Sequence, residues 1–241
     1  MGIDVNNKKK VSFNPSHERL VNTSVDSNPK IKRVSVKGYE NSILVFSIFS
    51  RRRSSDGRDG NPLIYAFKCL NNYSITKDEV LKFRPNFKKV IKKINQLKQF
   101  DCDVIVTIPS SSNVVKIVAR LVGFILKKKV ISDFFEKCTV YEVVSKINID
   151  RVDYYDQNNV SGAIYTLCLK GEDLIFNIKD INNDIRHYFK PLKIKNNYNF
   201  SDKNVVIIDD VLSSGTSLIS GLELIPLGYK KVVGLTLLSS L

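Results

Sequence analysis

Two adjacent carboxylates, Asp209 and Asp210, follow the uninterrupted aliphatic run 205–208 and precede a turn of small residues. Such a run is typical of a strand buried on both faces of a parallel sheet. The turn consists of Ser213, Ser214, Gly215, Thr216 and Ser217. Apolar spacing then predicts a helix over residues 218–227.

The small side chains of this turn suit the binding of an anion. Successive backbone N–H groups can surround one anion, and the following helix directs its positive dipole end at the same point. The turn contains no lysine, so it differs from the loop that wraps a triphosphate and suits a single phosphate monoester. Carboxylates at the carboxyl end of a strand accept hydrogen bonds from sugar hydroxyls and favour a nearby cation. A site that holds a phosphate beside two hydroxyl-binding carboxylates matches a ribose 5-phosphate group. The structural alternative is a buried strand that ends in an Asp pair whose only role is to cap a helix.

The stretch Val205–Ser217 resembles the motif with which type I phosphoribosyltransferases bind phosphoribosyl pyrophosphate (PRPP). That motif has four hydrophobic residues, two acids, two hydrophobic residues, two small residues, Gly, any residue, and Ser or Thr, and every position matches. The resemblance continues through residues 228–238. It implies an α/β fold with a twisted parallel sheet flanked by helices. It also implies that Asp209 and Asp210 hold the ribose hydroxyls, that the turn holds the 5-phosphate, and that Mg²⁺ bridges the pyrophosphate and the ribose.

A second buried strand is predicted over residues 103–108, followed by a short polar loop and a helix over 114–128. The resemblance implies that this loop, which includes Pro109, Ser110 and Ser111, binds the pyrophosphate through backbone N–H groups, which Pro109 itself lacks. Family members often carry Lys, Arg or Gly in this loop, whereas this chain carries three serines. Lys116 and Arg120 either face the pyrophosphate or are surface charges.

The part of the chain before residue 101 is strongly basic. The net charge is +14 overall, and residues 1–100 hold 21 basic and 8 acidic side chains. This asymmetry suggests an anionic partner, with nucleic acid the first candidate and Arg51, Arg52 and Arg53 as its phosphate contacts. A lysine-rich face that is simply solvated explains the charge equally well.

The local patterns before residue 101 predict a hairpin and a helical segment. Residues 43–49 and 63–70 form a β-hairpin whose tip contains two Asp-Gly turn signals. A capping box at Thr76 starts a helix, Pro85 breaks or kinks it, and 87–100 is a basic amphipathic helix.

Three segments are expected. Residues 1–40 form a basic flexible arm, 41–100 an extension that serves as a hood over the acceptor, and 101–241 the phosphoribosyltransferase-like core.

The pattern is looser between the two buried strands. Ser132 is the expected cap of a helix over 133–146, and residues 162–170 alternate like a strand. Residues 147–200 resemble the corresponding stretch of ComF-type competence proteins. His187 is either an acid–base or phosphate contact or a structural histidine.

Composition excludes several classes of protein. The four cysteines are widely spaced without a C-x-x-C pair, which favours buried thiols over zinc or disulfides. No apolar run is long enough to span a bilayer, and the N-terminus lacks a signal-peptide core. A cytoplasmic protein without membrane attachment is expected.

The resemblance leads to two hypotheses of function. The first is a phosphoribosyltransferase that moves the phosphoribosyl group of PRPP to a nitrogen acceptor, which the sequence does not identify, and releases pyrophosphate. The alternative is a non-catalytic or regulatory protein on the same fold. Such a protein binds nucleic acid or acts as an effector in a larger stress or defence assembly. Under either hypothesis the chain is expected as a homo-oligomer or an assembly subunit.

Overall fold

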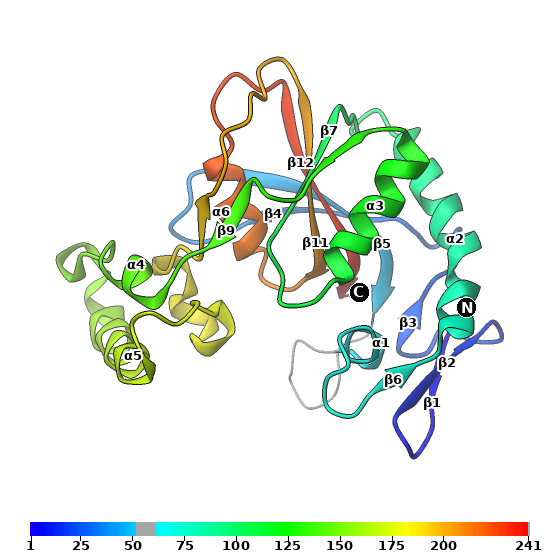
Figure 1. The fold of residues 1–241 in the computed structure, drawn as a ribbon, viewed down its shortest axis with the longest axis horizontal. Helices are drawn as coiled ribbons and strands as arrows, with labels where there is room; N and C mark the ends of the chain where they lie inside the picture. The colour runs from blue at the N-terminus through cyan, green and yellow to red at the C-terminus, as the bar shows by residue number, and fades with distance from the viewer. Residues whose placement is uncertain (52–60, 241) are drawn as a thin grey trace.

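A central sheet of seven strands organises the part of the chain described by the computed structural model, residues 1–51 and 61–240 (Figure 1). Its strands are β3 (Val21–Asn22), β4 (Lys30–Ser35), β5 (Ser42–Arg51), β7 (Val104–Thr107), β8 (Lys129–Ile131), β11 (Asn204–Leu212) and β12 (Lys231–Ser240). The order is β3-β5-β12-β11-β7-β8, and β4 pairs with β5 beside β3. Five neighbouring strands, β5, β12, β11, β7 and β8, are parallel to one another, whereas β3 and β4 run antiparallel to β5. The expected α/β fold with a mostly parallel sheet is confirmed.

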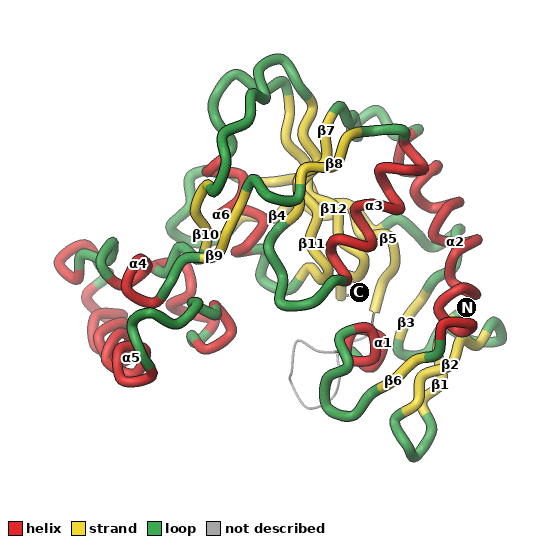
Figure 2. The backbone as a smooth tube through the Cα atoms, in the orientation of Figure 1, coloured by secondary structure: helices red, strands yellow, loops and turns green. Residues whose placement is uncertain are grey.

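Helices cover both faces of this sheet (Figure 2). They are α1 (Pro62–Phe67), α2 (Lys77–Asn95), α3 (Val114–Leu126) and α6 (Thr216–Leu224). Strand β11 shows the two faces clearly, because Val206 and Ile208 join the core under α1, α2 and α3, whereas Val205 and Ile207 join the core under α6. All four side chains are fully buried, as expected for a strand covered on both sides.

The N-terminal segment is folded, so the expectation of a flexible arm is wrong. Strands β1 (Gly2–Val5), β2 (Lys10–Asn14) and β6 (Ser74–Ile75) form a small three-stranded sheet. Ile3 and Val11 are fully buried in it, and β4 hydrogen-bonds along β5. Each short strand contributes only one or two apolar side chains to the core, which is too few to give a visible periodicity in a polar stretch.

The expected hairpin is also wrong in its second strand. Residues 62–67 form helix α1, which begins with Pro62 at its first position and is capped by the Asn61 side chain accepting from Leu63 N. The tip, residues 52–60 with Arg52 and Arg53, lies outside the described residues. Strand β5 lies inside the central sheet next to β12, so the sheet draws on the segment predicted as an extension.

The predicted start of helix α2 at Thr76 is confirmed, whereas the predicted break at Pro85 is wrong. The Thr76 side chain accepts a hydrogen bond from Glu79 N, as the capping box predicted. Pro85 lies inside one continuous helix that ends at Asn95. The apolar stripe that includes Phe87 and Ile91 is buried.

Residues 138–189 form a helical insertion with its own core (left in Figure 2). It contains α4 (Val140–Val144), η1 (Ile149–Arg151), η2 (Tyr154–Asp156), α5 (Gln157–Lys170), η3 (Ile178–Asp180) and η4 (Asn183–Tyr188). It is flanked by β9 (Phe135–Lys137) and β10 (Leu192–Ile194), which pair antiparallel.

Two predictions for this region are wrong. The helix expected over 133–146 is replaced by β9 and by α4, which is capped by Thr139 rather than Ser132. The alternating stretch 162–170 belongs to helix α5. In the described residues, no helix is both long and apolar enough to cross a membrane.

Candidate functional site

The two predicted loops lie at the same edge of the sheet. Strand β11 pairs with β7 in the register Ile207↔Val106 and Ile208↔Thr107. Because the strands are parallel, Asp209 of β11 lies one residue beyond the level at which β7 ends. The serine loop of residues 109–113, which follows β7, therefore starts beside Asp209. The structure therefore brings the acidic pair and both loops together at the carboxyl edge, where open α/β sheets bind ligands.

The turn after β11 has the backbone that an anion site needs. Gly215 has a φ of 82° and directly precedes α6, offering no capping side chain. The Ser214 and Thr216 hydroxyls lie 3.0 Å apart. Ser213 and Ser217 are half-buried and Ser214 is exposed, so part of the turn is open to solvent. The turn passes so close to Val34 of β4 that a Cβ on Gly215 would collide with the Val34 side chain. Only glycine therefore fits at this position.

The two aspartates do not share one environment. Successive side chains of a strand point to opposite faces, and β11 extends through both acids to Leu212. Asp210 pairs with the ammonium group of Lys68, which follows α1, and the two side chains are only 11% and 9% exposed. Asp209 stays on the α6 side of the sheet and keeps part of its surface exposed.

Burial and a neighbouring charge control the protonation of Asp209. Desolvation and the negative charge of Asp210 raise the pKa of Asp209 to about 7. A hydrogen bond from Asp210 N to Asp209 Oδ1 at 2.8 Å and the charges of Lys68 and Lys179 oppose this rise. Burial, together with the positive charges of Lys179 and Lys68, lowers the pKa of the half-buried Lys137.

Three lysines thus accompany the acids, and sequence reasoning missed all three. Lys68 follows α1, Lys137 ends β9 and Lys179 lies in η3 of the insertion. They are distant along the chain, and single lysines carry no signal in a sequence with 38 basic residues. The local balance of three cations and two acids favours an anionic ligand.

Other candidate residues lie elsewhere. Arg51 is fully buried at the end of β5, so it is not a surface contact for nucleic acid. Arg120 lines a groove between α2 and α3 instead of the serine loop. His187 is 6% exposed and packs on Tyr188 inside the insertion. Lys116 is exposed near the start of α3.

The side chains near the acids do not fit a magnesium site held by the protein. In residues 1–51 and 61–240, no group of three or more His, Cys, Asp or Glu side chains is placed to hold a metal ion. Lys68 already neutralises Asp210, and burial together with the charge of Asp210 raises the pKa of Asp209. The four cysteines are free thiols.

Comparison with known proteins gives little further information. No family model and no curated protein matches the chain. Adenine phosphoribosyltransferase from Leishmania tarentolae aligns with 10% identity and a TM-score of 0.38, over 99% of this chain and 94% of that one. The enzyme from Leishmania donovani aligns with the same identity and TM-score, over 99% and 86%. Such values do not identify an activity, so the function has to be inferred from the residues and geometry of the chain's own site.

Proposed function

We propose that this protein is phosphoribosyltransferase-like and binds PRPP, or another ribose 5-phosphate ligand, at the carboxyl end of β11. It transfers the phosphoribosyl group to a nitrogen acceptor and releases pyrophosphate. One observation carries the proposal. The complete thirteen-residue motif folds as a buried strand, an acidic pair, a turn with a left-handed glycine and a helix, at the carboxyl edge of a parallel sheet.

Each part of the site has a role in this reaction. The backbone N–H groups of residues 213–217, with their hydroxyls, bind the 5-phosphate. Asp209 accepts hydrogen bonds from the ribose hydroxyls and, when ionised, stabilises the positive charge that develops on the ring as pyrophosphate leaves. Asp210 lies on the other side of β11 and takes the same role only if its pair with Lys68 opens when the ligand binds. Ser110 and Ser111 line the pyrophosphate loop. Positioning and electrostatics supply the rate, so no nucleophilic side chain is required.

The magnesium requirement stays a prediction. Because the described side chains do not form a direct site, no step is assigned to the ion. A PRPP-binding assay with Mg²⁺, and again with excess chelator, decides whether the ion contributes.

The proposal is tested by the melting temperature of the full chain with PRPP and by pyrophosphate release with a panel of nitrogen bases. We expect PRPP at 100 times its Kd to stabilise the fold by about 2.7 kcal/mol. We expect Asp209→Asn/Asp210→Asn to abolish pyrophosphate release. Unchanged melting with PRPP and with ribose 5-phosphate would reject the proposal.

A regulatory protein on the same fold is the second candidate. The Lys68–Asp210 pair favours it, because an acid that is already neutralised and desolvated is poorly placed to stabilise a transition state. Such a protein senses PRPP or a related nucleotide and acts on nucleic acid or within an assembly. PRPP-dependent stabilisation without pyrophosphate release from any base would favour this candidate over the enzyme.

A further inference from the structure

Strand β4 places two lysines beside the turn after β11. Lys30, Lys32 and Val34 alternate along β4, so their side chains point to the same side of the strand. Val34 lies directly against Gly215 of the turn. The same face of β4 that supports the turn therefore also presents two ammonium groups.

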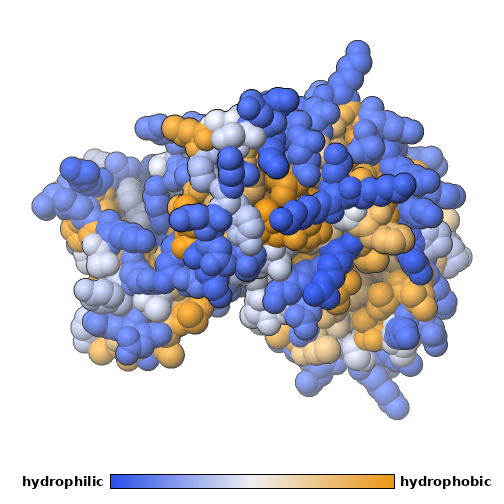
Figure 3. Space-filling view, turned by 45° about the horizontal axis from the view of Figure 1, so that its top comes forward, coloured by the Kyte–Doolittle hydropathy of each residue, from blue (hydrophilic) through white to orange (hydrophobic). Residues whose placement is uncertain are grey.

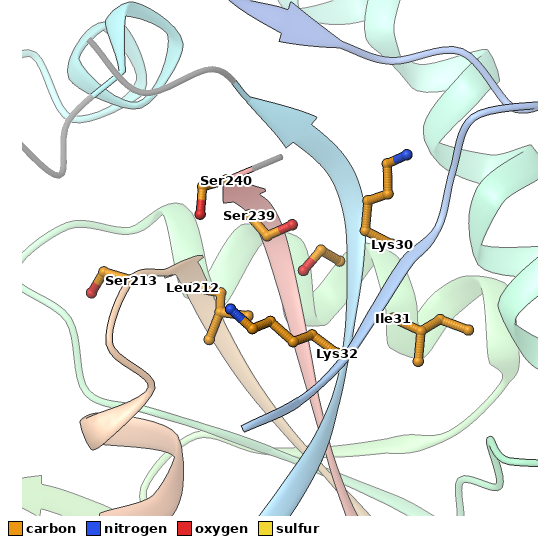
Figure 4. A pocket seen from close by; sticks show the side chains of 8 residues that line it. Lys30, Ile31, Lys32, Leu212, Ser213, Ser239 and Ser240 are labelled. Carbon is orange, nitrogen blue, oxygen red and sulfur yellow. The ribbon is translucent and has the colours of Figure 1, made fainter. Parts of the chain in front are cut away.

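A cavity of about 230 Å³ lies between β4 and the ends of β11 and β12 (Figure 4). Its polar lining comes from Lys30, Lys32, Ser47, Ser213, Ser239 and Ser240, and no acidic residue lines it. Figure 4 shows the side chain of Lys32 extending from β4 to Leu212, whereas the side chain of Lys30 points away from Leu212 and Ser213. Ser213 belongs both to this cavity and to the turn.

Several polar groups in the cavity have no partner within the described residues. The Ser239 hydroxyl and the ammonium groups of Lys30 and Lys32 have no hydrogen bond or ion pair there. By contrast, the buried hydroxyl of Ser47 is satisfied by Thr236 at 2.8 Å. The Ser239 hydroxyl is not among the fully buried polar atoms that lack a partner, so it and the two ammonium groups are available to an anion that enters the cavity.

We propose that this cavity is a phosphate subsite in which Lys32 is the principal cation, Lys30 a weaker one and Ser239 a hydrogen-bond donor. It supplies the positive charge that the lysine-free turn lacks. The ligand class is a phosphate monoester. Its identity as the 5-phosphate of a ribose rests on the proposed function, whereas the binding of phosphate itself does not.

The test uses calorimetric titration of the full chain with ribose 5-phosphate, inorganic phosphate and ribose. We expect Lys32→Gln to weaken ribose 5-phosphate at least about tenfold, with Lys30→Gln and Ser239→Ala weakening it less. Arg33→Gln is the matched control, because Arg33 lies on the same strand, points to the other face and donates to the Ser42 hydroxyl at 3.2 Å. It should change the affinity less than twofold. Lys32 is exposed, so its removal should leave the melting temperature unchanged.

The possible results separate this subsite from the proposed function. Wild-type affinity in Lys32→Gln, with loss of binding in Asp209→Asn, would overturn the subsite and leave the proposed function intact. Lys32-dependent binding of inorganic phosphate, with no gain from ribose, would support the subsite and reject the sugar site. Failure of wild type to bind either phosphate compound would overturn both.

Discussion

Asp209 and Asp210 are equivalent in the sequence motif but not in the folded chain. One carboxyl is paired with a lysine from outside the motif, and the other is desolvated on the opposite side of β11. The motif fixes which residue types meet at the edge of the sheet. It does not fix their protonation, because that depends on Lys68, Lys137 and other charges brought in by distant elements.

The raised pKa of Asp209 predicts a pH-dependent stability. Its pKa is about 7 in the folded chain, against an ordinary value of 3.8. The folded chain therefore keeps a proton that the unfolded chain releases. Its stabilising contribution is complete below about pH 4 and is lost as the pH rises through 7, by at most about 1.4 kcal/mol per pH unit. Between pH 5 and 7 we expect the melting temperature of wild type to fall more steeply than that of Asp209→Asn. Parallel curves for the two proteins would show that Asp209 titrates normally.

The Lys68–Asp210 pair predicts an asymmetric effect of mutation. Lys68→Met leaves a buried carboxylate without its partner and should lower the free energy of unfolding by about 3–5 kcal/mol. Lys68→Met/Asp210→Leu removes both charges and should recover most of that loss. Chemical denaturation measures both. Lys37→Met is the control, because its pair with Asp153 at 2.7 Å is largely exposed and should matter little. Equal effects of Lys68→Met and Lys37→Met would contradict the desolvated pair.

At the scale of elements, the sequence predicted the parts with a strong local signal. Buried strands β7 and β11, the Thr76 cap and helix α3 all follow from aliphatic runs, caps or clear periodicity. Residues 63–70 and 162–170 were misassigned because short apolar runs do not distinguish a strand from a helix. For residues 63–70, the Asn61 cap and Pro62 were signals of a helix start. The aliphatic and aromatic residues that follow favoured a strand and outweighed those signals.

The candidate site was predictable only in part. The acids and both loops came from one contiguous motif and one repeated strand-loop-helix pattern. Lys32 and Ser239 could not be assigned, because their proximity to the turn depends on β4 pairing with β5 and on β12 pairing with β11. Pairings of strands so far apart in sequence leave no local pattern.

The turn between β11 and α6 predicts a strong effect at Gly215. Gly215→Ala places a Cβ against Val34 and forces a non-glycine residue to a φ of 82°. We expect a loss of about 1–3 kcal/mol in unfolding free energy and weaker binding of ribose 5-phosphate. Gly162→Ala is the matched control, since nothing lies within 4 Å of the place its added methyl group would occupy and α5 should gain about 0.5–1 kcal/mol. A Gly215→Ala protein as stable as wild type would show that the turn can relax.

For the whole molecule, the basic N-terminal charge is distributed over folded elements. Part of it lies on β4 beside the turn, and part surrounds the groove between α2 and α3, which has a volume of about 1140 Å³. The basic residues of this groove are Arg84, Lys88, Lys92, Arg120, Lys127 and Lys128, and no acidic residue lines it. Phe124 in the same groove is 79% exposed. Figure 3 shows exposed apolar side chains lying among long hydrophilic ones on this side of the molecule. Since Arg51 is buried, the regulatory alternative would place a nucleic acid at this groove.

The regulatory alternative therefore predicts where single-stranded nucleic acid binds. Cations that contact phosphates release counterions, and an exposed aromatic ring offers a base a stacking surface. We expect the affinity for a single-stranded oligonucleotide to fall with salt. Lys88→Gln/Lys92→Gln should reduce the log–log salt slope by about 1.4, because each lost contact contributes about 0.7. Lys8→Gln/Lys10→Gln removes the same charge at the β1–β2 turn, whose lysines do not line the groove, and should leave the slope unchanged, which separates groove contacts from net charge. Fluorescence anisotropy measures both slopes. Salt is varied between 50 and 200 mM, because phosphate contacts lose most of their contribution to affinity over this range. Equal slopes for the two double variants would mean that the groove makes no phosphate contacts and that the basic charge serves only as a solvated face.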